Sequence, residues 1–181
     1  MAERFSSLSP DLAQWWREQP VFFVATAPTG DAGHVNLSPK GLDTLRVLAG
    51  DRVAYLDLTG SGVETIAHLR ENGRVTLMAC AFRGNPRISR IYGRGEVHVV
   101  GSPEFEALSP QFPDLPGKRA IIDIAVERVT TSCGYSVPLM DLVEDRERLL
   151  DWARAKGADG VVEYRQKKNA VSIDGLPGID A

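Results

Sequence analysis

The stretch Arg74–Val100, RVTLMACAFRGNPRISRIYGRGEVHVV, decides the fold class of this chain. Its first part, Arg74–Phe82, is apolar on both faces, which is typical of a strand at the centre of a sheet. The turn Arg83–Pro86 follows, and Arg87–Val100 then alternates between two kinds of face, as a long strand does. Two strands joined by so short a turn pair antiparallel. The stretch therefore predicts an antiparallel sheet.

Four further segments have the pattern of strands. They are apolar or alternating over short lengths, and they lie at Val21–Ala27, His34–Ser38, Arg52–Leu58 and Arg119–Val129. Strands and helices alternate at most once along the chain, which excludes a doubly wound parallel sheet. We expect a mainly β (α+β) fold, a six-stranded antiparallel barrel flanked by short helices, because closure removes the exposed edges of a sheet.

Helices are expected where capping residues precede helical periodicity. Ser9 and Pro10 begin an N-terminal helix, and Ser61 with Glu64 forms a capping box for a helix that ends at Gly73. Later helices are predicted at Pro103–Phe112, Glu144–Lys156 and Asp159–Asn169.

Length and composition limit the classes of protein. The 181 residues suit one domain, placed at 1–181, with the barrel at about 20–130 and a C-terminal helical extension at about 141–181. Lys and Arg number 21 against 24 Asp and Glu, and this formal charge of −3 argues against a general nucleic-acid binder. No apolar run approaches about 18 residues and no signal-peptide pattern is present, so we expect no membrane span and a cytoplasmic location.

Histidines and cysteines form no metal or catalytic motif. His34, His68 and His98 fall on separate elements without metal-ligand spacing, so we expect no metal site. The two cysteines, Cys80 and Cys133, are too few for a disulfide framework. A cysteine hydrolase would need a reactive thiol of low pKa at Cys133, but a structural thiol is the interpretation we favour.

Two segments have the residue types that bind an anion and a polar ring. The turn Thr59–Gly62 (TGSG) precedes a helix and offers backbone N–H groups and hydroxyls to an anion. In His34–Gly41 (HVNLSPKG), Asn36 and Ser38 share one face of a strand and suit a polar heterocycle, while Lys40 supplies a cation for a phosphate.

Several motifs in order resemble the pyridoxamine 5′-phosphate oxidase-like family of flavin-binding split barrels. They are Val35–Gly41, Tyr55–Gly62 leading into Glu64–Asn72, Arg74–Met78 and Arg90–Val97. The resemblance implies a split barrel in a homodimer, with FMN in a groove between the subunits. It also implies a flavin-dependent oxidoreductase that moves a hydride or electrons between a reduced nicotinamide and a small-molecule substrate. The implied cofactor-binding residues are Asn36, Leu37, Ser38, Pro39, Lys40, Gly41, Thr59, Gly60, Ser61, Gly62, Arg90 and Tyr135.

The chain departs from that family in one turn. Relatives carry basic residues after the second of these strands, where this chain has Leu58, Gly62 and Val63, which leaves Lys40 with Arg46 or Arg74 to offset a phosphate. Alternatives are a deazaflavin-dependent reductase of the same fold and a non-enzymatic flavin- or haem-binding protein that uses one of the histidines.

Overall fold

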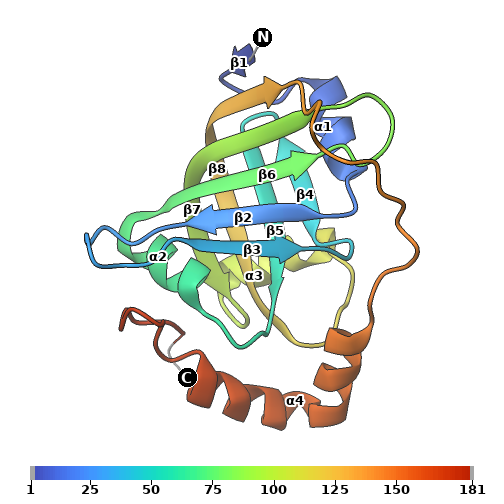
Figure 1. Cartoon of the computed structure of the whole chain (residues 1–181). Coiled ribbons are helices and arrows are strands. Elements are labelled where there is room, and N and C mark those ends of the chain that lie inside the picture. Colours follow the sequence, from blue (N-terminus) through green and yellow to red (C-terminus); the bar gives the residue numbers. More distant parts are fainter. Residues whose placement is uncertain (1–2, 180–181) are drawn as a thin grey trace.

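The computed structural model describes residues 3–179, whose strands form one antiparallel sheet (Figure 1). The sheet has eight strands in the order β3-β2-β6-β7-β8-β5-β4, with β1 paired to β8. The strands are β1 (Glu3–Phe5), β2 (Phe22–Thr26), β3 (Asn36–Lys40), β4 (Leu45–Ala49), β5 (Arg52–Leu58), β6 (Arg74–Cys80), β7 (Ile88–Val99) and β8 (Lys118–Ser132). The mainly β antiparallel prediction is therefore confirmed.

The predicted number of six strands is wrong, because β1 and β4 escaped the sequence pattern. β1 has only three residues, all exposed, and it forms only by pairing with the far end of β8. β4 forms a hairpin with β5 in which Ala49 faces Arg52, so Gly50 and Asp51 make the turn. A glycine and an aspartate between two apolar runs are a hairpin signal, and that signal could have located β4.

The long strands β7 and β8 curve and fold the sheet around the main core (Figure 1). A bulge separates Tyr92 from Gly93, and a Cβ on Gly93 would lie 2.2 Å from the carbonyl oxygen of Ala125 in β8. Glycine thus permits the close approach of the two backbones. The core is filled by fully buried side chains, among them Trp16, Val24, Leu77, Ile91, Ile122 and Ile124.

The helix α1 (Pro10–Arg17) begins where the sequence predicted. The Ser9 hydroxyl accepts a hydrogen bond from the backbone N–H of Leu12 at 3.3 Å. Trp16 is buried, and its ring N–H donates to Ser89 of β7 at 3.0 Å, which fixes α1 against the sheet.

The helix α2 (Glu64–Asn72) starts later than its predicted capping box. Its N-cap is Val63, which has no side-chain cap, so the expected pairing of Ser61 with Glu64 is wrong. Glu64 instead accepts a hydrogen bond from the backbone N–H of Ile173. The predicted end is confirmed, since Gly73 has a left-handed φ of 70°.

The remaining helical segments lie between β7 and β8 and after β8. The helix α3 (Pro103–Leu108), capped by Ser102, runs into the 3-10 turn η1 (Ser109–Gln111). The helix α4 (Arg148–Lys168) is broken by non-helical backbone at Gly157, close to the predicted boundary between two helices, but it starts after the predicted Glu144. An irregular segment, residues 133–147, runs from β8 down one side of the molecule to α4 (Figure 1).

Within residues 3–179, no helix combines the length and apolar character that a membrane crossing requires.

Candidate functional site

The strand β3 turns its polar side chains toward the core side of the sheet. Asn36, Ser38 and Lys40 are half-buried, whereas Leu37 and Pro39 between them are exposed. The alternation predicted for this strand is thus present, but its apolar side faces solvent, with Leu37 64% exposed. Gly41 follows β3, and its carbonyl oxygen accepts a hydrogen bond from the Thr44 hydroxyl at 2.8 Å.

A chain of side-chain hydrogen bonds holds the polar side of β3 against α2. The Ser38 hydroxyl donates to the Asn36 amide oxygen at 3.1 Å, and the Asn36 amide nitrogen donates to Thr65 at 2.9 Å and to Thr26 at 3.2 Å. Thr26 lies 3.0 Å from Nδ1 of His68. The other ring nitrogen of His68, Nε2, is buried and has no hydrogen-bond partner within residues 3–179.

Lys40 of β3 belongs to a buried ion-pair cluster with Asp57 of β5 and Arg119 of β8. Its ammonium lies 3.2 Å from one carboxylate oxygen of Asp57, and the guanidinium of Arg119 in β8 lies 2.7 Å from the other. Asp57 is only 1% exposed. Burial alone would raise the pKa of Asp57, but Arg119 and Lys40 outweigh burial and hold that pKa below its usual value. Asp57 thus stays ionised at neutral pH.

The turn Thr59–Gly62 is held from behind by the C-terminal part of the chain. The Thr59 hydroxyl donates to the carbonyl oxygen of Gly117 at 2.9 Å and accepts from Nε of Arg165 in α4 at 2.8 Å. The side-chain amide of Asn169 donates to the carbonyl oxygen of Gly60 at 3.0 Å. Arg119 donates to the carbonyl oxygen of Gly62 at 2.8 Å.

The backbone N–H groups of this turn differ from its carbonyl groups in their hydrogen bonding. Within residues 3–179, the backbone N–H groups of Gly60, Ser61 and Gly62 donate to no acceptor. Ser61 and Gly62 are exposed, and a Cβ on Gly60 would meet nothing within 4 Å. The carbonyl side of the turn thus faces the protein, while donors and open space remain on the other side.

Sequence reasoning missed three of these residues: Arg119, Arg165 and Asn169. Arg165 in α4 and Asn169 directly after α4 lie more than a hundred residues from the turn. Arg119 lies on β8, whose register with β5 the sequence did not reveal. Arg46 and Arg74, the other cations predicted to offset a phosphate, lie elsewhere. Arg46 pairs with Asp43 at 2.6 Å, and Arg74 donates to the side chain of Asn72. Only Lys40 among the predicted cations reaches the cluster.

The remaining candidate residues, Arg90 and Tyr135, lie away from this cluster. Residues directly opposite in paired strands point to the same side, and the register links Pro39 to Phe23, Met78 and Arg90 in turn. Arg90 therefore shares the outer face with Leu37 and Pro39, not the face of Lys40. Tyr135 is 82% exposed on the segment 133–147. Within one chain, Lys40 and Arg90 of the predicted site therefore lie on opposite faces of the sheet.

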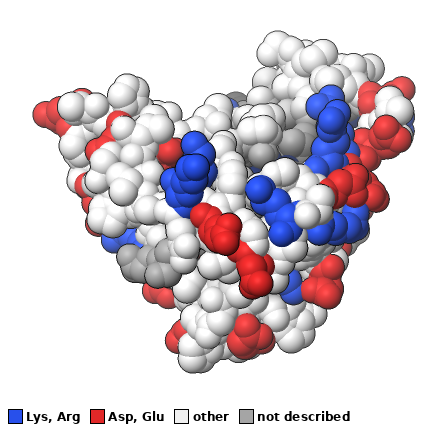
Figure 2. Space-filling view, turned by 90° about the horizontal axis from the view of Figure 1, so that it is seen from below, with Lys and Arg blue, Asp and Glu red and all other residues white. Residues whose placement is uncertain are grey.

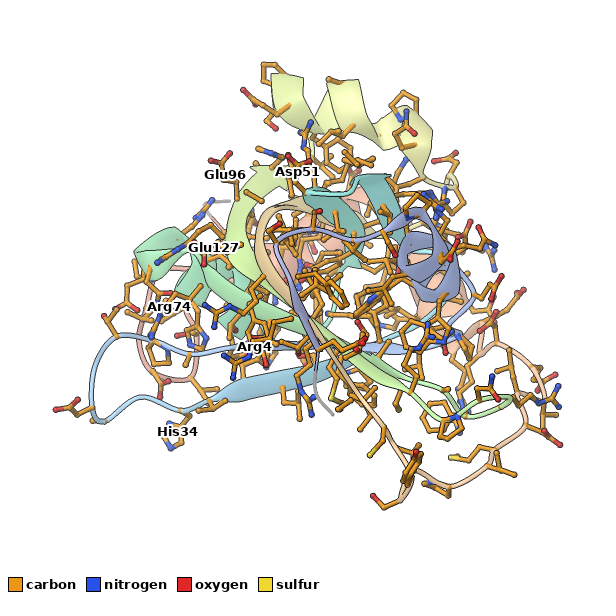
Figure 3. The ribbon with its side chains drawn as sticks, turned by 90° about the horizontal axis from the view of Figure 1, so that it is seen from above. Arg4, His34, Asp51, Arg74, Glu96 and Glu127 are labelled. Carbon is orange, nitrogen blue, oxygen red and sulfur yellow. The ribbon has the colours of Figure 1, made fainter. Side chains whose placement is uncertain are left out.

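The outer face also carries a hollow of about 360 Å³. It is lined by the exposed apolar Val35 before β3, by Tyr92 of β7 and by the charged side chains of Arg74, Arg94 and Glu127. In Figure 3, Arg74 and Glu127 lie on this side, near Arg4. A planar group would meet both an aromatic ring and cations here.

The three histidines do not come together. His34 lies on the connection between β2 and β3 at the edge of the molecule, where it contacts Asp174 at 2.6 Å (Figure 3). His68 is buried, and His98 lies 3.6 Å from Asp123. Within residues 3–179, no group of three histidine, cysteine or acidic side chains is arranged to hold a metal ion.

The cysteines differ in exposure. Cys133 is exposed, whereas Cys80 is buried and burial raises the pKa of its thiol. A raised pKa suits a structural thiol at Cys80.

Charge on the surface is mixed. On the face shown in Figure 2, basic and acidic side chains are interspersed, with uncharged surface between them. The charged side chains of this face therefore include both signs within the same region.

Comparison with known proteins decides the family. The sequence profile of pyridoxamine 5′-phosphate oxidase matches residues 8–133, well over half of the chain. The chain belongs to the pyridoxamine 5′-phosphate oxidase family. It is also 41% identical to the pyridoxamine 5′-phosphate oxidase family protein ustO of Aspergillus flavus, over 97% of this chain and 77% of the fungal protein.

Solved structures agree with the oxidase-family fold. HupZ of group A Streptococcus is 20% identical, with a TM-score of 0.52 over 67% of this chain and 91% of that one. A Lactobacillus delbrueckii protein, provisionally named a pyridoxamine 5′-phosphate oxidase, is 19% identical, with a TM-score of 0.51 over 69% of this chain and 94% of that one. At these identities the likeness shows the fold alone.

Proposed function

We propose that this protein binds FMN and acts as a flavin-dependent oxidoreductase on a small molecule, as a homodimer. Membership of the pyridoxamine 5′-phosphate oxidase family supports a flavin cofactor. The observation that carries the proposal is local. Lys40 reaches Asp57 across the gap between β3 and β5, and Asp57 is two residues before the Thr59–Gly62 turn. The two segments predicted to bind one phosphate thus lie at one cluster.

The residues present fit the phosphate of FMN. Lys40 supplies positive charge, and the N–H groups of Gly60 and Ser61 supply donors without acceptors within residues 3–179. Successive backbone N–H groups in a turn form a common anion site. The open space at Gly60 lets an oxygen approach the backbone closely.

The polar side of β3 would position the ring system. Asn36 and Ser38 are already fixed by their hydrogen bonds to each other and to Thr65, so their orientation is set before a ligand arrives. Bound FMN supplies the hydride and electron transfer chemistry. The chain's own residues bind the phosphate, orient the ring and exclude water, which fits the lack of an acid–base pair among the predicted site residues.

A second copy of the chain would unite the two faces. Arg90 and Tyr92 lie on the outer face of the sheet, away from Lys40 of the same chain. The exposed side of β3 and the segment 133–147 carry large apolar side chains: Val35, Leu37, Tyr135, Leu139, Met140, Leu142 and Val143. Exposed apolar patches of this kind mark protein interfaces. In the dimer we propose, one copy gives the phosphate end of the groove and the other its outer wall.

The substrate side follows from the same groove. A small planar molecule would stack beside the ring, and a reduced nicotinamide would donate the hydride. Both would enter between the outer face of one copy, which carries Tyr92, and the polar side of β3 of the other copy.

Flavin binding tests the proposal. FMN is titrated into the purified chain, and quenching of its fluorescence gives the dissociation constant. We expect tight binding, weakened about tenfold to a hundredfold by Lys40→Gln, since a hydrogen bond to a charged group contributes about 1.5–3 kcal/mol. The exposed Lys167→Gln in the last turn of α4 removes the same charge as a control. The proposal fails if the unaltered chain does not quench FMN, or if both variants bind FMN equally.

A further inference from the structure

Three cations lie near one buried carboxylate, Asp57, at the Thr59 end of the turn. Lys40 and Arg119 both contact Asp57, at 3.2 and 2.7 Å. Arg165 of α4 donates to the Thr59 hydroxyl at 2.8 Å and also to the carbonyl oxygen of Lys118. Neither partner of Arg165 carries a negative charge. With Asp57 as the single carboxylate among these contacts, the cluster has an excess of two positive charges.

The environment makes this excess costly in the absence of an anion. Arg119 is 5% exposed and Arg165 is half-buried. Burial lowers the pKa of Arg165 most, the neighbouring Arg119 lowers it further, and Asp57 acts in the opposite direction. Cations that repel each other away from water are stabilised by an anion placed between them and solvent.

The turn needs a cation from elsewhere. Residues 59–63 read TGSGV, so the turn has N–H donors and hydroxyls but no basic side chain of its own. At its far end, the Glu64 carboxylate lies close to Gly62, where a Cβ would come within 2.4 Å of it. That carboxylate repels an anion from the Gly62 end. The free N–H groups of Gly60 and Ser61, next along the turn from Thr59 and its partner Arg165, are left as the favourable position.

We infer that Arg165, carried by the C-terminal helix, supplies the positive charge for a phosphate monoester at the Thr59–Gly62 turn. This inference rests on the proposed FMN function. A phosphate monoester carries about −1.5 to −2 charge at neutral pH, which matches the excess of two positive charges. The helix α4 is then part of the ligand site, and Arg165 stands in for basic residues that the turn lacks.

The test compares two ligands that differ only in the phosphate, FMN and riboflavin, on the full chain. With Arg165→Gln, we expect the dissociation constant for FMN to rise about tenfold or more, equivalent to about 1.4 kcal/mol. The constant for riboflavin stays unchanged. Arg165→Lys, which keeps the charge, retains most of the FMN affinity. Lys167→Gln, two residues along the same helix, changes neither constant.

Each other outcome has a distinct meaning. If Arg165→Gln weakens FMN and riboflavin equally, Arg165 only supports the fold, and the inference is overturned. If the unaltered chain binds FMN and riboflavin equally, the phosphate contributes nothing: the inference fails while the flavin proposal stands. If the unaltered chain binds neither flavin, the proposed function itself fails, and the inference falls with it.

Discussion

The Asp57→Asn substitution tests the ion-pair cluster that organises the site. It keeps the size of the side chain but removes the charge that lies between Lys40 and Arg119. Removing one partner of a buried ion pair costs about 3–5 kcal/mol, because it leaves buried charge uncompensated. At about 2–4 °C per kcal/mol for a chain of this length, the melting temperature would fall by roughly 6–20 °C.

Urea unfolding of the ligand-free chain, followed by tryptophan fluorescence, measures this loss. The matched control is Asp114→Asn, because Asp114 also pairs with a lysine, Lys118, at 2.6 Å, but is 94% exposed. Exposed pairs contribute under about 1 kcal/mol. A loss for Asp57→Asn no larger than that for Asp114→Asn would refute the reasoning.

The pH dependence of the same variant follows from the lowered pKa of Asp57. A carboxyl whose pKa is lower in the folded chain stabilises that state above its unfolded pKa, here near 3.8, and loses this contribution as the pH falls below it. The difference in unfolding free energy between wild type and Asp57→Asn should therefore be constant at neutral pH and shrink below about pH 4.

Two further predictions concern other parts of the site. Burial lowers the pKa of His68 below 6.5, so the unfolded chain takes up the proton more readily. The unfolding free energy should fall between about pH 7 and 5, and less so in His68→Gln; an equal fall would contradict the buried neutral ring. In the proposed two-fold dimer, Leu37→Lys removes two apolar contacts of about 2 kcal/mol each, which weakens the dimer roughly a thousandfold. Analytical ultracentrifugation should show monomer for Leu37→Lys but dimer for the exposed Glu104→Lys on α3.

The sheet could largely be predicted because its signals are local. The alternation in β7 and the apolar run of β6 each depend on neighbouring residues in the sequence. The same is true of the left-handed glycine that ends the helix α2. β1 could not be predicted, since its three exposed residues form a strand only beside β8. The capping box at Ser61 was wrong because Glu64 accepts a hydrogen bond from the C-terminal tail instead.

The site was harder to predict because its charges come from distant elements. Lys40 and the Thr59–Gly62 turn could be singled out from local residue types. Their connection depends on Asp57 and Arg119, and hence on the register between β5 and β8. Arg165 was invisible to sequence reasoning, since a basic residue near the end of a helix usually has only a capping role.

The most direct test of flavin binding is the visible absorption spectrum of the full chain. The chain is purified, mixed with FMN and freed of unbound ligand by gel filtration. We predict that the bands of oxidised flavin elute with the protein at one FMN per chain, and that they are lost on Lys40→Gln with Arg165→Gln. A colourless protein fraction, or a double variant that retains FMN as the wild type does, would contradict the account.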